Sequence, residues 1–188
     1  TTDAKGNVIK FSYDQLSRLT QTTYPDNSKT TSTYDAVGNR TSSTDPNGNS
    51  TIYSYDAVNR LIQVTDALGN ITQYSYDTEG NRSAITAANN NTTQYFYDSL
   101  NRLIITLDPL NHQTLFSYDP VGNLISKTDA NGNTINYVYD VLNRLIKKQY
   151  PDQTEETFTY DAKGNMLTAA NSNISYNFIY DSLSQLIG

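Results

Sequence analysis

Hydrophobic and polar residues alternate along short runs of the chain, and clusters of Gly, Asn and Asp separate these runs. In residues 71–76 (ITQYSY), Thr72, Tyr74 and Tyr76 share one face of an extended chain, because strand side chains alternate with a period of two. Residues 60–65 (RLIQVT) are rich in β-branched and aliphatic side chains. No window of useful length shows helical periodicity. The pattern predicts an all-β chain of antiparallel hairpins.

The dipeptide Tyr-Asp recurs along the whole chain. Its copies are Tyr13-Asp14, Tyr34-Asp35, Tyr55-Asp56, Tyr76-Asp77, Tyr97-Asp98, Tyr118-Asp119, Tyr139-Asp140, Tyr160-Asp161 and Tyr180-Asp181. The period is constant up to Tyr160, and the last interval is one position shorter. A fixed period indicates one structural unit per repeat, here a 21-residue unit, stacked in series. We therefore predict a single repeat array over residues 1–188, with about eight to nine repeats and incomplete at both ends.

The fourth residue after each Tyr is one that tolerates a positive φ. This position holds Ser17, Gly38, Asn59, Gly80, Asn101, Gly122, Asn143, Gly164 and Ser184. Gly and Asn adopt the left-handed conformation at low cost, which predicts a turn here. Repeats reading YDxxGN alternate with repeats reading YDxxNRL, which gives a 42-residue super-period over most of the chain. In the second type an Arg follows, so that Asp56 and Arg60 can form an ion pair.

A second turn is predicted halfway through each repeat. DAKGN at 3–7, DPNGN at 45–49, DALGN at 66–70 and DANGN at 129–133 share an Asp followed by Gly-Asn. Degenerate versions lie at 25–29, 108–112 and 151–154. Each repeat thus has two turns separated by two strands.

The repeated Tyr and Asp have a structural interpretation. Two residues before the Tyr stands an aromatic residue in eight of the nine copies, with Ser32 the exception. Residues at this spacing share a strand face, so stacked hairpins would form two aromatic ladders, with residues such as Leu61 and Leu103 between the rings. The Asp carboxylate is expected to accept backbone N–H groups two or three residues further on.

Charge and composition exclude several classes of partner. The net charge is −6 and no basic cluster occurs, so we predict no nucleic-acid binding. No apolar run approaches the length of a transmembrane helix, so no membrane span is predicted. Hydrophobic residues make up only 36% of the chain, yet 16 Tyr and 5 Phe are present. Aromatic residues spread in this way are typical of sheet faces rather than of disorder.

The sequence predicts no catalytic, cofactor-binding or metal-binding residue. The only histidine, His112, stands where Asn49, Asn70 and Asn133 stand in other mid-repeat turns, so we interpret it as a turn residue. One His without Cys cannot build a zinc site or a Ser-His-Asp triad. Calcium remains an alternative at the DPNGN and DANGN turns, although the Gly is fourth rather than sixth as in an EF-hand loop.

In YDxxGN, YDxxNRL and the intervening DxxGN, the chain resembles the YD-repeat (Rhs) family from Asp3 to the YDSLSQL segment at Tyr180. The family includes bacterial Rhs toxins, toxin-complex shell subunits, wall-associated proteins and teneurins. The resemblance implies a continuous antiparallel sheet that spirals into a hollow shell. DPVGN at 119–123 lacks the flanks of the family's self-cleavage motif, so no protease residue is carried over.

Two functions follow as expectations. The first is a non-catalytic structural region of a secreted or cell-surface bacterial protein, part of a hollow β-shell that encloses or displays a toxin or effector. The alternative is an extracellular filament or adhesin whose copies join through their edge strands, with the aromatic ladders binding a surface glycan. An enzyme is the third and least favoured class.

Overall fold

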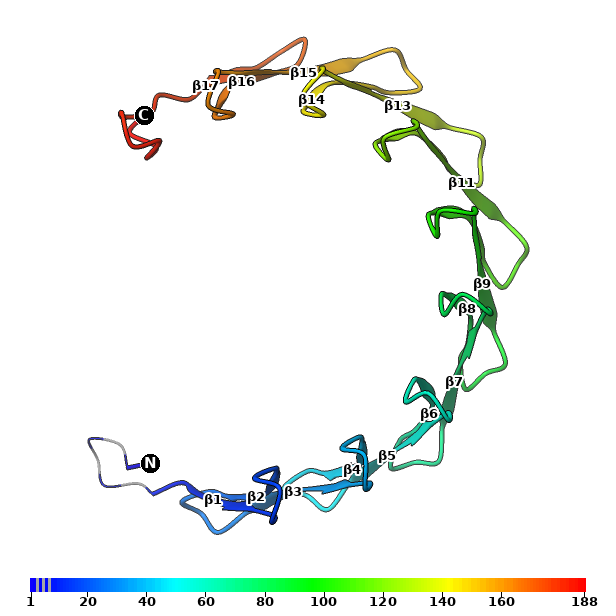
Figure 1. Ribbon diagram of the computed structural model, residues 1–188, viewed down its shortest axis with the longest axis vertical. Coiled ribbons are helices and arrows are strands. Elements are labelled where there is room, and N and C mark those ends of the chain that lie inside the picture. The colour runs from blue at the N-terminus through cyan, green and yellow to red at the C-terminus, as the bar shows by residue number, and fades with distance from the viewer. Residues whose placement is uncertain (3, 5, 7) are drawn as a thin grey trace. The chain divides into compact units, whose positions relative to one another are not determined.

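The computed structural model describes residues 1, 2, 4, 6 and 8–188, and within them the chain is all-β (Figure 1). Seventeen strands form one antiparallel sheet, as predicted. Asp3 and Asn7, which belong to the turn predicted at 3–7, lie outside the described residues. The described residues contain no helix long and apolar enough to cross a membrane.

The strands alternate between two lengths along most of the chain. Most odd-numbered strands have six residues and end at a repeat Tyr, whereas the even-numbered strands have five. Their bounds are β1 Lys10–Tyr13, β2 Leu19–Thr23, β3 Lys29–Tyr34, β4 Arg40–Thr44, β5 Ser50–Tyr55, β6 Leu61–Thr65, β7 Ile71–Tyr76, β8 Arg82–Thr86, β9 Thr92–Tyr97, β10 Leu103–Leu107, β11 Gln113–Tyr118, β12 Leu124–Thr128, β13 Thr134–Tyr139, β14 Leu145–Gln149, β15 Glu155–Tyr160, β16 Met166–Ala170 and β17 Ser175–Asn177.

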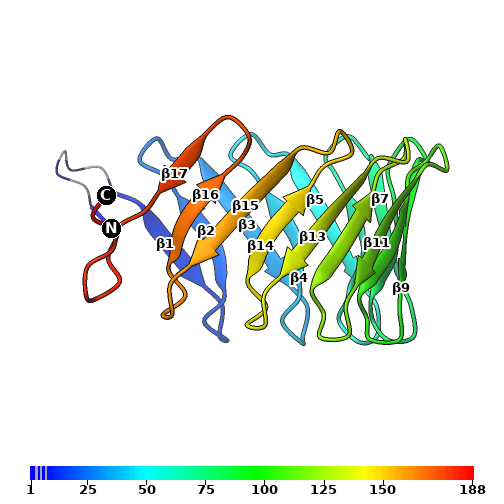
Figure 2. The same cartoon turned by 90° about the horizontal axis from the view of Figure 1, so that it is seen from above.

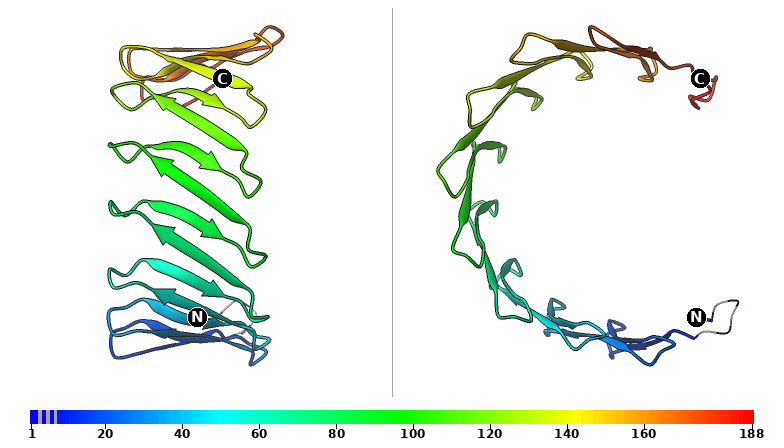
Figure 3. Two further views of the ribbon diagram at one scale, coloured as in Figure 1. Left: turned by 90° about the vertical axis from the view of Figure 1, so that its right-hand side faces the viewer. Right: turned by 180° about the vertical axis from the view of Figure 1, so that it is seen from behind.

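Each strand pairs with the next one in the sequence, so the sheet is a continuous series of hairpins. The chain divides into two compact units, Thr1–Gln94 and Tyr95–Gly188. In each unit the strands run across a narrow strip, so that the turns lie along its two borders (Figures 2 and 3). We call the turns that begin at the repeat Asp, such as 56–60, the YD turns, and those on the opposite border, such as 66–70, the mid-repeat turns.

Both kinds of turn have the same backbone geometry. In the YD turn at 56–60, Asp56 N donates to Arg60 O at 2.9 Å and Asn59 N donates to Asp56 O at 3.0 Å. In the mid-repeat turn at 66–70 the corresponding bonds are both 3.0 Å. Only the fourth residue has a positive φ, for example 65° at Asn59 and 81° at Gly69. These features define a three-residue hairpin loop in which a β-turn is followed by a left-handed residue. The turn residue at this position therefore has to be one that tolerates positive φ.

A β-bulge accompanies the YD turns. In β7–β8, Ser75 pairs with Ala84 but Tyr76 pairs with Arg82, so Ser83 is left over on β8. The same shift occurs beside the other YD turns whose pairing is resolved in the strand register. A bulge bends its strand and increases the local twist. Its recurrence in register therefore gives each unit a repeated bend (Figure 3).

The sheet has a single layer and encloses no hydrophobic core. The described residues include no buried hydrophobic side chain, and Thr22, at 8% exposure, is the buried polar residue. On β7, Thr72, Tyr74 and Tyr76 are half-buried whereas the side chains between them are exposed, as the alternation predicts. Cohesion in such a sheet has to come from contacts between neighbouring hairpins rather than from a shared interior.

The shorter interval between the last two Tyr-Asp copies originates in a shortened turn. The turn at 171–174 has four residues, and Asn171 N donates to Ile174 O at 2.9 Å. The mid-repeat turns at 129–133 and 150–154 have five. One residue is therefore missing at 171–174. Strand β17 ends at Asn177, and Tyr180 forms only an isolated bridge with Leu186.

Candidate functional site

The repeat Asp organises the backbone of its own turn. Asp56 Oδ1 accepts the N–H groups of Val58 at 3.0 Å and Arg60 at 2.9 Å. The sequence predicted acceptance two or three residues further on, and the bond to the second residue is found; the bond to the fourth residue was not predicted. The fourth residue reaches the same oxygen because the left-handed residue before it turns its N–H inward. Asp35 also accepts from the third, Gly38, at 2.8 Å.

The second carboxylate oxygen binds the side chain of the fifth turn residue. In the YDxxNRL repeats, and in the YDQLSRL repeat at Tyr13, this is an Arg, whose Nε lies 2.7 Å from Oδ2. The four pairs are Asp14–Arg18, Asp56–Arg60, Asp98–Arg102 and Asp140–Arg144. In the YDxxGN repeats it is an Asn, whose Nδ2 donates over 2.8–3.1 Å. The predicted ion pair of Asp56 with Arg60 is confirmed.

The same Arg side chains connect each YDxxNRL repeat to the next hairpin. Arg102 Cζ lies 4.9 Å from the centre of the Tyr118 ring, and Arg102 Nη1 donates to Asp119 O at 2.9 Å. The stacked pairs are Arg18–Tyr34, Arg60–Tyr76, Arg102–Tyr118 and Arg144–Tyr160, at 4.6–4.9 Å. A guanidinium over an aromatic face is attracted by the ring quadrupole. Each of these Arg residues therefore forms an ion pair with the Asp of its own turn and stacks on the Tyr ring of the next repeat.

Asn performs the corresponding task in the YDxxGN repeats. Asn123 Nδ2 bonds to Asp119 Oδ2 at 2.8 Å and to Asn143 Oδ1, in the next repeat, at 2.9 Å. Asn39 reaches Asn59 in the same way at 2.9 Å. The predicted left-handed Asn is therefore also an acceptor for its neighbour. Sequence reasoning missed these contacts, although the strict alternation of Gly-Asn with Asn-Arg indicated that successive repeats need complementary residues.

The repeat Tyr hydroxyl bonds backward to the preceding hairpin. Tyr76 Oη donates to Leu61 O at 2.8 Å, and Leu61 is the residue paired with Tyr55 at the bulge. Tyr34, Tyr55, Tyr118, Tyr139 and Tyr160 make the equivalent bond at 2.8–3.1 Å. Tyr13 is 59% exposed, and Tyr180 lies beyond the last strand. The sequence indicated where these rings lie but not that their hydroxyls bridge two repeats.

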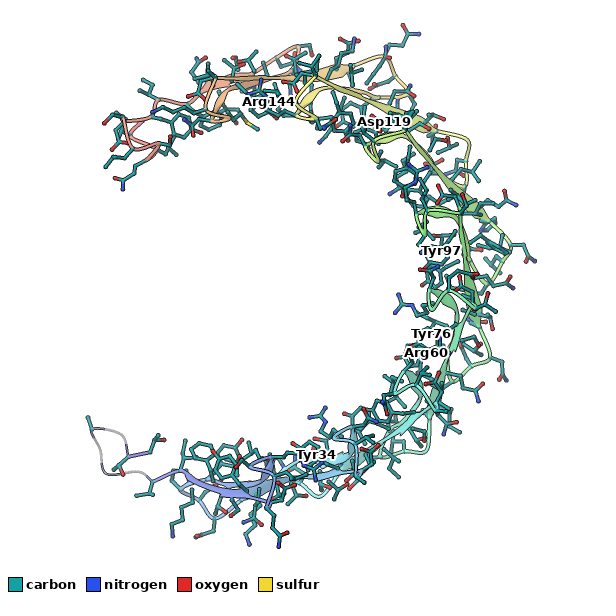
Figure 4. All side chains as sticks on the ribbon, viewed as in Figure 1. Tyr34, Arg60, Tyr76, Tyr97, Asp119 and Arg144 are labelled. Carbon is teal, nitrogen blue, oxygen red and sulfur yellow. The ribbon has the colours of Figure 1, made fainter. Side chains whose placement is uncertain are left out.

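On the aromatic face, the cross-strand neighbours of the rings include aliphatic side chains of the intervening strands. Tyr74 faces Ile85 across β7–β8, and Tyr53 faces Val64 across β5–β6. Leu61 lies opposite Tyr55 on β6, the strand between those that carry Tyr55 and Tyr76. In the first unit, Tyr34, Arg60 and Tyr76 lie on the concave side of the strip, and in the second unit Tyr97, Asp119 and Arg144 do so (Figure 4).

The mid-repeat turns use their polar residues locally. His112 N and Nδ1 lie 2.9 Å from Asp108 Oδ1 and Oδ2, which is the arrangement of Asn49 with Asp45. The prediction that His112 is a turn residue is confirmed. The turn at 87–91, which sequence reasoning missed, has the same backbone bonds without an Asp at its start. Counting one full period onward from the turn at 66–70 would have found it.

Hydrogen bonding shifts the titration of the turn carboxylates. The carboxyl pKa values of Asp45, Asp66 and Asp129 lie below the usual value. The main cause is a hydrogen bond from the side-chain amide of the Asn four residues later, followed by one from the backbone N–H of the same Asn. In Asp56 and Asp140 the Arg backbone N–H is the main cause of the lowered pKa. Donors aimed at a carboxylate favour its charged form. The lowered pKa values of these Asp carboxyls therefore follow from the geometry of the turns.

The carboxylates offer little free capacity for chemistry. Their oxygens accept two to four bonds from the turn itself, as at Asp35. Among the described residues, no group of three or more His, Cys, Asp and Glu side chains converges on a common point. The side-chain contacts connect successive hairpins along the YD-turn border. They define a class of protein, a single-layer sheet of tandem hairpins.

A family model for the RHS repeat matches residues 1–29, 34–71, 55–92, 76–113 and 118–155. The chain belongs to the RHS repeat family. None of the curated proteins compared with the chain matches it.

Two solved structures of toxin complexes share the fold. One is a Photorhabdus luminescens Tc holotoxin pore carrying a TccC3 mutation, with 23% identity and a TM-score of 0.70 over 85% of this chain. The other is TcdB2–TccC3 without its hypervariable C-terminal region, with 19% identity and a TM-score of 0.76 over 96% of this chain. This chain spans only 10% and 12% of those two chains.

Proposed function

We propose that the chain is a non-catalytic wall segment of a hollow β-shell, within a larger secreted or cell-surface bacterial protein, that encloses or displays a toxin or effector. The observation that carries the proposal is a sheet with no buried hydrophobic side chain in its described part, held together from repeat to repeat. Such a construction suits a wall, because repeats can be added one after another without packing around a common hydrophobic core.

The chemistry of the repeat supports a structural role for the Tyr and Asp positions. Each repeat Asp is bonded within its own turn, and most of the repeat Tyr hydroxyls are bonded to the neighbouring hairpin, as Asp119 and Tyr118 illustrate. An active site is a single arrangement within a domain, whereas these contacts recur in register. The whole of residues 1–188 is accordingly proposed to be one repeat array without an enzyme site, cofactor or metal.

The test uses the complete protein encoded by the reading frame that contains this chain. Limited proteolysis of the native protein should leave an enclosed segment intact while the same segment is cleaved after denaturation. Replacing Arg102 and Arg144 with Ala should increase cleavage, because both junctions that these residues hold would weaken. Lys29→Ala is the matched control, since Lys29 is exposed on β3. A native protein that protects no segment contradicts the proposal.

The alternative, a filament or adhesin joined through edge strands, rests on β17. Its three residues are exposed, and the strand pairs with β16 alone. Backbone groups on such an edge can template pairing with another chain. Electron microscopy of the same purified protein distinguishes the two functions: closed particles support the shell, and fibres of indefinite length support the filament. The glycan version requires retention on a carbohydrate array.

A further inference from the structure

The last three strands carry a hollow between two aromatic rings. Phe158 on β15 pairs with Ala169 on β16, and Ala169 pairs in turn with Tyr176 on β17. The three side chains therefore lie in one cross-strand row, with the small Ala methyl between the two rings. A hollow of about 210 Å³ opens above this methyl and is also lined by Glu156 and Ile174.

The row at Ala169 differs from the corresponding rows of the other hairpins. Where a ring stands on the first strand and the register is described, the residue facing it is larger than Ala: Thr22, Val64, Ile85, Lys127 and Lys148. The residue that follows in these rows, on the third strand, is Thr30, Thr72, Thr93, Ile135 and Glu156. A second ring with Ala before it is thus a feature of the last hairpin, and the sheet does not require it.

The spacing of the strands sets the width of the hollow. Strands two apart lie roughly 9.6 Å from one another, and side chains stand roughly perpendicular to the sheet. Subtracting about 3.5 Å for the thickness of the rings leaves about 6 Å between their surfaces. Tyr176 is 60% exposed and Ile174 is 51% exposed, so this apolar surface is open to a ligand. The width suits one aromatic ring or one branched aliphatic group.

The polar groups at the rim are already bonded to one another. Lys148 Nζ lies 3.3 Å from Glu156 Oε2 and 5.7 Å from the centre of the Phe158 ring, and the Tyr150 side chain is hydrogen-bonded to Glu156. Asn171 Oδ1 accepts the N–H groups of Asn173 and Ile174, each at 2.9 Å. A charged group or a sugar would lose water here for few new hydrogen bonds. The rim therefore favours an uncharged apolar group.

The hollow opens on the concave side of its unit. Phe158 shares a strand face with Tyr160, on which Arg144 stacks, and Arg144 lies on the concave side (Figure 4). We propose that the hollow binds one large apolar side chain, such as a phenyl group, of a polypeptide lying against this side. The inference rests on the proposed wall function, because a polypeptide enclosed by the shell is the partner that faces the concave side.

Nuclear magnetic resonance of the chain with a side-chain analogue tests the proposal. N-acetyl-L-phenylalaninamide at millimolar concentration should shift the Ala169 methyl and Tyr176 ring signals in a saturable way, and N-acetyl-L-alaninamide should not. Ala169→Ile and Tyr176→Thr each install the residue found in the row of Tyr74, so both should keep the sheet by circular dichroism. Each should weaken binding about tenfold or more, read from the signal that the variant retains.

Two further variants sharpen the test. Thr157→Gln is the matched control, because Thr157 lies on the opposite face of β15 and Gln73 stands at the corresponding position of β7; it should bind as the wild type does. Ile85→Ala with Thr93→Tyr rebuilds the hollow beside Tyr74 and should add a second binding site, so that the Tyr74 ring signals also shift.

A wild-type chain without a saturable shift overturns the proposal. So does binding that both Ala169→Ile and Tyr176→Thr leave unchanged, or methyl α-D-glucopyranoside shifting the same signals at a lower concentration than the phenyl analogue. Proteolytic protection in the complete protein without binding at this hollow would overturn this inference and leave the wall function standing. Binding at the hollow without protection of any segment would do the reverse.

Discussion

At the scale of single residues, one carboxylate binds the backbone and a side chain of most of the five-residue turns. Asp45 uses Oδ1 for the N–H groups of Asn47 and Asn49 and Oδ2 for the Asn49 side chain. Protonation would convert one of these oxygens into a donor facing other donors. The folded state therefore holds these Asp residues in the charged form, which is what their lowered pKa expresses.

The stability of the sheet should accordingly depend on acid pH. A carboxyl pKa that is lower in the folded than in the unfolded chain contributes stability above the unfolded value of about 4 and loses it as the pH falls through the folded value. We expect thermal midpoints, followed by circular dichroism, to be flat from about pH 7 to 5 and to fall steeply below about pH 4. Asp45→Asn with Asp66→Asn and Asp129→Asn should be less stable at neutral pH but show a shallower acid decline. An equally steep decline in that variant would contradict the assignment.

At the scale of hairpins, two kinds of connection alternate along the YD-turn border. Arg102 stacks on Tyr118 and bonds to Asp119 in the following repeat, whereas Asn123 bonds to Asn143 in the one after it. Two successive YDxxNRL repeats would place a second Arg beside the Asp carbonyl that the first Arg binds. Two successive YDxxGN repeats would leave the Asn amide without an acceptor, because the Gly at the fourth turn position has no side chain. Neither connection therefore forms between two repeats of the same kind. The 42-residue super-period is thus a rule of complementarity between neighbours.

A double-mutant cycle on one connection measures its strength. Arg102→Lys should cost about 1 kcal/mol, because Lys keeps the charge but loses the planar fork and most of the stacking. Tyr118→Leu should cost about 2 kcal/mol, because it removes both the ring on which Arg102 stacks and the hydroxyl bond to Leu103 O. Urea unfolding of the single and double variants gives the coupling energy. Costs that add without coupling would show that the two side chains act independently, and Lys29→Ala should change little.

At the scale of the whole molecule, stability is a sum over repeats and junctions, because the part of the chain that the structure describes has no buried hydrophobic side chain. Substituting one junction should weaken its neighbourhood and leave distant hairpins unchanged. The fold is therefore extensible by whole repeats, provided that the alternation of the two repeat types is kept.

Deleting repeats tests this rule. Removing residues 119–160 joins Tyr118 to Asp161, so that Arg102 still meets a YDxxGN turn. Removing residues 119–139 joins Tyr118 to Asp140, which brings Arg102 beside Arg144 and leaves Asn143 without the donor Asn123. We expect the longer deletion to unfold at a higher urea concentration than the shorter one. The opposite order would show that length, rather than complementarity, governs stability.

Much of the fold was predictable because the chain repeats its local signals. The strand at 71–76, with its half-buried Tyr74 and Tyr76, and the left-handed residues Asn59 and Gly80 follow from patterning and φ preference alone. The turn at 87–91 was missed because Ala87 replaces the Asp that marks other turns. The shortened turn at 171–174 could be read only as a shorter interval between Tyr160 and Tyr180, since nothing local identifies which residue is absent.

The sequence by itself determined the all-β class, the 21-residue unit and the residues that stand at its turns, because hairpin loops and strand faces depend on neighbours a few positions apart. Only the tertiary structure decided what these residues do for one another. Tyr76 bonds to Leu61, Arg102 covers Tyr118, and Asn123 reaches Asn143, each in the neighbouring repeat. Such contacts depend on strand register and on the bulge beside each YD turn, and register is set by the pairing of whole strands rather than by any local preference.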